Sequence, residues 1–173
     1  MSDFPPNPPS APFPNKLRAT FRRRVVLHAR AVQLAVLGAE APVLEEDPAV
    51  HLMNLAFALR NLLRIAEVAR DVPGVSEAKA KFEAAIPGIK DARDVLEHFD
   101  DYALGVGKLQ QRGALREFFT IVERNGTYAT LNVAARFTIS TEKAFPAAVE
   151  LGVELLRALA PGRPIAVEPR RAR

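Results

Sequence analysis

Apolar residues recur every three or four positions over most of the first hundred residues, a spacing typical of amphipathic helices. In the first of these runs the repeated apolar positions include Val25, Leu27 and Leu34. The pattern predicts helices over 16–37, 48–71, 76–85, 89–104 and 141–160. Proline and glycine separate them, and Gly38 with Pro42 predicts the end of the first helix.

The period changes to two between residues 117 and 139. Two runs rich in β-forming residues, 117–123 and 128–139, flank Asn125-Gly126, which is a strong hairpin signal because the turn needs positive φ at both positions. We expect the second run to be one continuous strand with Leu131, Val133 and Phe137 on its apolar face. Two strands alone are marginally stable in water. This face must therefore pack on the helices or on a second copy of the chain, and a homodimer through the hairpin edge is one hypothesis.

The predicted fold is mainly α, an antiparallel bundle of about five helices with one β-hairpin inserted before the last helix. A single domain is expected over residues 16–160. Residues 1–15 contain six prolines and are expected to form a disordered tail, and residues 161–173 are expected to form a basic flexible tail. No segment resembles a signal peptide or is apolar enough to span a bilayer, so we expect a cytoplasmic protein without membrane association.

The composition of the chain excludes several kinds of site. The chain has no cysteine, which excludes disulfides, thiolate metal sites and a cysteine nucleophile. It also lacks the usual phosphate-loop, nucleophile-elbow and zinc-protease motifs, and no cofactor or metal is predicted. Of the three histidines, His28 and His51 lie in helical runs and are expected to be packing or surface residues. The net charge of +4 is uneven, because residues 31–160 hold 14 basic and 18 acidic residues, a balance of −4.

The third histidine belongs to the most distinctive segment, residues 90–102. On a helix, Asp94, His98 and Asp101 share one face, while Arg93 and Glu97 form a pair four residues apart. A histidine beside carboxylates suits acid–base chemistry near neutral pH, and an arginine can hold a phosphate. The same pattern also fits a solvated face with ion pairs within the helix. A metal held by the three face residues is a weaker alternative, because one helix would supply every ligand.

Arg93-Asp94 followed by His98 resembles the R-x(4–6)-H signature of HEPN-domain proteins, and the surrounding sequence is similar to uncharacterised bacterial members of that superfamily. The resemblance implies a helical bundle that dimerises so that two Arg/His pairs line one groove. Many such proteins are metal-independent endoribonucleases. Arg93 would then contact the scissile phosphate, His98 would act as acid–base, and Asp94 would be a polar support. In two respects the chain departs from the pattern: Asp100 stands where toxin members often have tyrosine, and a hairpin is present.

Two functions follow from these observations. The first is a non-catalytic, dimeric interaction module in which Arg93, Asp94 and His98 form structural contacts. The alternative is an endoribonuclease of toxin or defence type that uses these residues and has a nucleotidyltransferase-type antitoxin partner. The segment 90–102 carries five acidic and two basic residues, and this local acidity disfavours RNA as a partner.

Overall fold

The computed structural model describes residues 15–41, 47–70, 74–113, 120–134 and 136–159. Within these residues the chain is mainly helical, with a small three-stranded antiparallel sheet before the last helix, and this confirms the predicted fold class. The described part contains seven helices: α1 (Asn15–Ala39), α2 (Pro48–Val68), α3 (Val75–Ala85), α4 (Ile89–Glu97), α5 (Phe99–Ala103), α6 (Lys108–Gln111) and α7 (Thr141–Leu159). The strands are β1 (Thr120–Asn125), β2 (Tyr128–Val133) and β3 (Phe137–Ser140). The predicted tails at 1–15 and 161–173 lie outside the described residues, except for Asn15, which begins α1.

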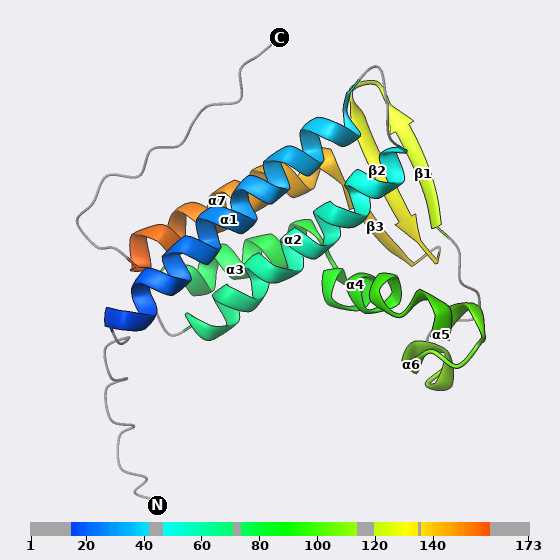
Figure 1. The fold of residues 1–173 in the computed structure, drawn as a ribbon, viewed down its shortest axis with the longest axis horizontal. Coiled ribbons are helices and arrows are strands. Elements are labelled where there is room, and N and C mark those ends of the chain that lie inside the picture. The colour runs from blue at the N-terminus through cyan, green and yellow to red at the C-terminus, as the bar shows by residue number, and fades with distance from the viewer. Residues whose placement is uncertain (1–14, 42–46, 71–73, 114–119, 135, 160–173) are drawn as a thin grey trace, which may run out of the picture.

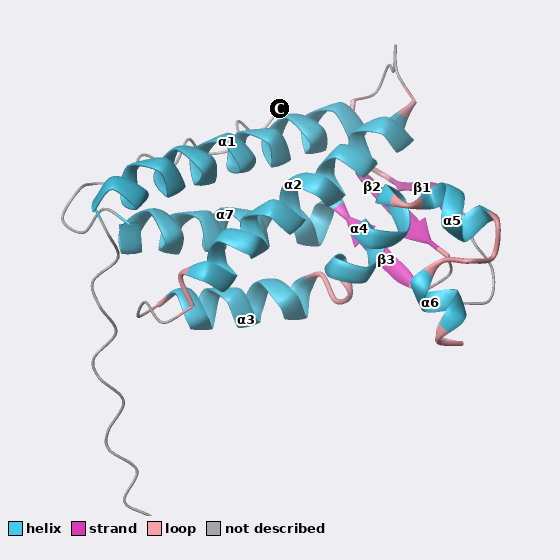
Figure 2. Ribbon diagram, turned by 60° about the horizontal axis from the view of Figure 1, so that its bottom comes forward, coloured by secondary structure: helices cyan, strands magenta, loops and turns pink. Residues whose placement is uncertain are grey.

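Three long helices, α1, α2 and α7, form the body of the molecule (Figure 1). Helix α1 contacts both α2 and α7, and α3 packs on α7. The sheet lies at one end of this body, with α4 packed against α2 and the strands (Figure 2). The short helices α5 and α6 extend from α4 beside the sheet.

The apolar stripe of α2 forms the centre of the core, since Leu52, Leu55, Leu59 and Leu62 are fully buried. Helix α1 differs from the simple expectation because its apolar residues lie on two faces. Val25, Val32 and Val36 are buried, whereas four large apolar residues are more than half exposed, namely Val26, Leu27, Leu34 and Leu37. The spacing of apolar residues therefore predicts the helix correctly, but part of this spacing belongs to an exposed face.

The predicted hairpin is confirmed, but its turn is shifted by one residue. Asn125 ends β1 and pairs with Tyr128, so the central positions are Gly126 and Thr127, and of the predicted pair Gly126 alone has a positive φ, 62°. The prediction of one continuous strand over 128–139 is wrong. The chain reverses between Val133 and Phe137, which are paired across β2 and β3. Ala134 has a φ of 54°, and the N–H of Arg136 donates to the carbonyl of Val133 at 3.1 Å. These two features close the second turn and add a third strand.

Two hydrogen-bonded contacts fix the sheet to the helices. The Arg124 guanidinium donates to the carbonyls of Ala39 and Ala41, each at 3.1 Å, and so satisfies carbonyl groups at the end of α1. The hydroxyl of Thr141 accepts a hydrogen bond from the N–H of Ala129 at 3.1 Å. The apolar face of the sheet is buried, with Leu131 fully covered. Of the two predicted alternatives, packing on the helices is therefore confirmed, while the hairpin edge as a dimer contact stays a prediction.

Several predicted boundaries are corrected. The predicted helix 89–104 is interrupted at His98, whose φ of −118° and ψ of 42° lie outside the helical region, and this residue separates α4 from α5. The glycines of residues 105–113 predict a loop from the sequence, but this segment contains α6. Helix α1 continues through Gly38 to Ala39, so Gly38 does not end it. The predicted start of the last helix is correct, since α7 begins at Thr141 and includes Pro146.

Candidate functional site

The predicted polar face of segment 90–102 comes together in the structure. Asp94, His98 and Asp101 line one small cavity, together with Tyr102 and with Lys108 from α6. The helix break at His98 does not separate them, because backbone hydrogen bonds of four-residue spacing continue across it. The N–H of His98 donates to the Asp94 carbonyl at 3.1 Å, and the N–H of Tyr102 donates to the His98 carbonyl at 3.2 Å. The sequence therefore predicts three of these residues correctly as neighbours.

Arg93 lies instead against Glu97, as the spacing of four residues predicts. The same Glu97 Oε2 atom that contacts Arg93 lies 4.0 Å from Nε2 of His98. One carboxylate thus stands between the arginine and the histidine. An incoming phosphate would have to displace this carboxylate before it could contact Arg93.

Asp94 has a clear structural contact. Its Oδ2 accepts a hydrogen bond from the Tyr102 hydroxyl at 3.2 Å, and the same hydroxyl accepts one from the N–H of Leu109 at 3.3 Å. Tyr102 is buried beneath Gly107, where an added Cβ would lie 2.3 Å from the tyrosine ring. Burial is the main cause of the raised pKa of Tyr102; the Asp94 and Asp91 carboxylates add to it, and the Leu109 N–H opposes it. Tyr102 therefore joins α4, α5 and α6.

The size and the charged lining of this cavity limit what it could bind. Its volume is about 50 Å³, enough for a few water molecules and far below the several hundred Å³ of ordinary ligand pockets. Two carboxylates and one lysine line it, which does not favour an anionic substrate. Within the described ranges, no three His, Cys, Asp or Glu side chains form a group that could hold a metal ion.

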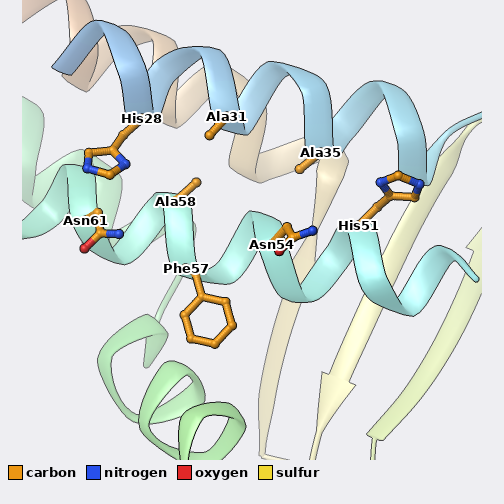
Figure 3. Close-up of a pocket in the computed structure, with 8 residues that line it drawn as sticks. All are labelled: His28, Ala31, Ala35, His51, Asn54, Phe57, Ala58 and Asn61. Atoms are coloured by element: carbon orange, nitrogen blue, oxygen red, sulfur yellow. The ribbon is translucent and has the colours of Figure 1, made fainter. Parts of the chain in front are cut away.

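A larger hollow lies between α1 and α2 and was not predicted from the sequence. Its volume is about 340 Å³ (Figure 3). The α1 side chains that line it are His28, Ala31 and Ala35, and those from α2 are His51, Asn54, Phe57, Ala58 and Asn61. Figure 3 shows His28 opposite Asn61 at one end and His51 beside the end of α1 at the other. The two helices therefore run in opposite directions along the hollow.

Local packing explains the shape of this hollow. Small residues on α1, Ala31 and Ala35, leave space above the contact between the helices. At one end, His51 packs so closely on α1 that a Cβ added to Gly38 would lie 2.4 Å from its Nδ1 atom. At the other end, burial and then the neighbouring Arg24 lower the pKa of His28, which favours the neutral ring. Both histidines were expected to be packing or surface residues, and each is half-buried in the hollow.

Once the hollow is known, two spacings in the sequence can be related to it. Asn54 and Asn61 are seven residues apart on α2, so they fall on one face. Ala31 and Ala35, four residues apart, do the same on α1. Neither pair alone identifies a site, because the two faces meet only once the helices are packed.

None of the helices in the described part of the chain is both long and apolar enough to cross a membrane. The chain matches no protein-family model, no curated protein and no solved structure.

Proposed function

We propose that the protein is a HEPN-like helical bundle that acts as a non-catalytic, homodimeric interaction module. The observation that carries this proposal is the exposed apolar surface on the two helices that border the larger hollow. Leu27 and Leu34 on α1 are 62% and 53% exposed, and Val50 and Val68 on α2 are 48% and 56% exposed. Large apolar side chains left exposed on two neighbouring helices favour a protein–protein contact surface.

The candidate catalytic residues support a non-catalytic role. Glu97 pairs with Arg93 and approaches His98, so both groups that the ribonuclease mechanism needs share one carboxylate. Asp94 holds the buried Tyr102 hydroxyl. The surrounding segment is acidic and would repel an RNA backbone. These contacts are those of a structural cluster at the α4–α5 junction.

Sedimentation velocity of the full chain over a wide concentration range tests the dimer. We expect a reversible dimer, since burial of exposed apolar area favours association. A chain that sediments as a monomer at every concentration would contradict the homodimeric part of the proposal.

The alternative, a metal-independent endoribonuclease with a nucleotidyltransferase-type partner, has one favourable observation. His98 shares its cavity with Asp94 and with the cation of Lys108. The test is incubation of structured and single-stranded RNA with the protein and with His98→Ala, in the presence of a chelator. The non-catalytic proposal expects no cleavage by either protein. Cleavage by the unaltered chain that His98→Ala abolishes would establish the alternative.

A further inference from the structure

We infer that the hollow between α1 and α2 binds a small uncharged molecule in which an aromatic ring carries an amide group. The size of the hollow, the side chains that line it and the charges at its ends support this ligand class. The inference goes beyond the proposed function and does not depend on the homodimer, because the lining residues all belong to one chain.

The hollow has the size of a small-molecule site. Its volume of about 340 Å³ lies at the lower end of the roughly 300–1,000 Å³ that is usual for ligand pockets. Small residues keep its middle open, since Ala31 of α1 lies opposite Ala58 of α2 between the two ends (Figure 3). An apolar cavity of roughly 150 Å³ can already hold a benzene ring. A ring with one polar substituent therefore fits in this hollow.

Four polar side chains line the hollow, and each can both donate and accept hydrogen bonds. Asn54 and Asn61 carry carboxamides, and His28 and His51 carry imidazole rings. His28 and Asn61 lie at one end, and Asn54 lies toward the end that holds His51 (Figure 3). None of the hydrogen bonds between described residues uses the carboxamide of Asn54 or Asn61 or the ring of His28. These three groups are therefore available to a ligand that has donors and acceptors of its own.

The lining favours an uncharged ligand. No charged side chain is among the described residues that line the hollow, and a charge moved out of water without a partner is costly. Burial and then the neighbouring Arg24 lower the pKa of His28, which favours a neutral ring with one acceptor nitrogen. Arg24 itself is exposed, where solvent and salt screen its charge. At the other end Arg124 donates to carbonyls of α1, and Asp47 caps α2.

Phe57 and three alanines give the hollow an apolar part. The alanines are Ala31 and Ala35 of α1 and Ala58 of α2. Phe57 is half-buried and lies on the side of α2 away from α1, so the hollow reaches across α2 to an aromatic ring (Figure 3). Aromatic ligands make stacked or edge-to-face contacts with such a ring. Apolar surface in the middle, with donors and acceptors at both ends, matches an aromatic ring that carries an amide.

Three probes of similar size test the ligand class: benzamide has the ring and the amide, toluene has the ring alone, and benzoate has the ring and a negative charge. Nuclear magnetic resonance of the histidine ring C–H signals of the full chain reports binding. His28 and His51 line the hollow, whereas His98 lines the cavity at the α4–α5 junction and is an internal control. We expect benzamide to shift the His28 and His51 signals with a Kd of about 1 mM or tighter, and to leave His98 unchanged. Toluene and benzoate should bind about tenfold more weakly, because toluene makes no hydrogen bond and benzoate loses hydration of its charge.

Two variants and one control test the location. Ala31→Leu fills the middle of the hollow and should weaken benzamide binding about tenfold or more. Asn61→Leu removes one carboxamide at nearly constant size and should weaken binding about fivefold, the equivalent of one neutral hydrogen bond. Ala19→Leu makes the same change as the first variant at an exposed position of α1 and should have no effect. Because all three positions are exposed or half-buried, we expect each variant to keep the thermal midpoint of the unaltered chain.

Each part of the inference has an outcome that overturns it. Unchanged His28 and His51 signals at about 10 mM benzamide, well above the expected Kd, would overturn the site itself. Toluene binding as tight as that of benzamide would overturn the role of the amide, and tighter binding of benzoate would overturn the uncharged class. Equal affinity of Ala31→Leu and the unaltered chain for benzamide would overturn the location. Sedimentation measures the homodimer separately, so none of these results decides the proposed function.

Discussion

Replacing Gly38 by alanine tests whether the structure places the ring of His51 against α1. Gly38 lies inside α1 with no positive φ, so helix propensity alone predicts that Gly38→Ala stabilises the protein by up to about 1 kcal/mol. The structure predicts the opposite sign. A Cβ at Gly38 would lie 2.4 Å from Nδ1, 2.5 Å from Cε1 and 2.7 Å from Cγ of His51. Ordinary contacts need roughly 3.5 Å, so the ring would have to retreat by about 1 Å.

The magnitude follows from two opposing effects. Overpacking of this kind costs roughly 1–3 kcal/mol, which exceeds the gain in helix propensity. We therefore expect Gly38→Ala to lower the free energy of unfolding by about 1 kcal/mol, and the thermal midpoint by about 2–4 °C for a chain of this size. Gly152 in α7 is the matched control, because its added Cβ would meet only Ala29 Cβ, at 3.9 Å. Gly152→Ala should stabilise the protein by about 1 kcal/mol.

Thermal and urea unfolding, followed by circular dichroism, measure both variants. The clash is isolated by repeating Gly38→Ala in a His51→Ala background, where the ring is absent and the same substitution should become neutral or stabilising. The difference between the two backgrounds is the coupling energy, expected to be about 1–3 kcal/mol. Equal stabilisation by Gly38→Ala and Gly152→Ala, or an effect independent of His51, would refute the close approach of the two helices at this end of the hollow.

Three further predictions concern other parts of the fold. Tyr102→Phe removes the donor to Asp94 and the acceptor of the Leu109 N–H. The free energy of unfolding measured in urea should therefore fall by about 1–2 kcal/mol. An unchanged unfolding midpoint would contradict the role of Tyr102 in joining α4, α5 and α6. Arg124→Ala leaves two carbonyls at the end of α1 without their donor, so the free energy of unfolding should fall by about 1 kcal/mol and amide hydrogen exchange in β1 should become faster. Exchange rates in β1 equal to those of the unaltered chain would contradict this role of Arg124. The pKa of His28 is lower in the folded chain than in the unfolded one, chiefly through burial and then through a neighbouring arginine, so the unfolded state binds the proton first as pH falls below about 6.5. Stability should therefore decline from pH 7.5 to 5.5, and His28→Gln should decline less; equal slopes would contradict burial of the ring.

The error in the strand prediction has a simple geometric cause. Val133 and Phe137 are paired across β2 and β3, so residues with odd numbers face the core in both strands. The reversal lies between Val133 and Phe137, an even number of positions apart, so odd-numbered residues face the core both before and after it. An unbroken strand and a second hairpin then have the same pattern of apolar residues. The turn also lacks glycine, since Ala134 adopts the positive φ, and no residue in the sequence indicates it.

The candidate cluster shows what spacing along one helix can predict. Arg93 with Glu97, and Asp94 with His98, are separated by four residues, so their proximity follows from helix geometry alone. Lys108 belongs to another helix beyond a loop, and the buried position of Tyr102 depends on its contact with Gly107. These contacts depend on how the chain turns after Ala103, which spacing does not determine. The sequence therefore predicts the pairs within the helix, and only the fold adds Lys108 and the buried Tyr102 to the cluster.

The same limit explains why the hollow between α1 and α2 could not be predicted. Glycine near the end of an apolar run usually indicates the end of a helix, and Gly38 was interpreted in this way. In the fold it lies within α1 and provides the space that His51 occupies. Likewise, periodicity cannot separate Val25, which is fully buried, from Leu27, which is mostly exposed, because both continue an apolar repeat. Helix α1 carries more apolar residues than the core covers, and the exposed ones, Leu27 among them, continue the same spacing as the buried ones.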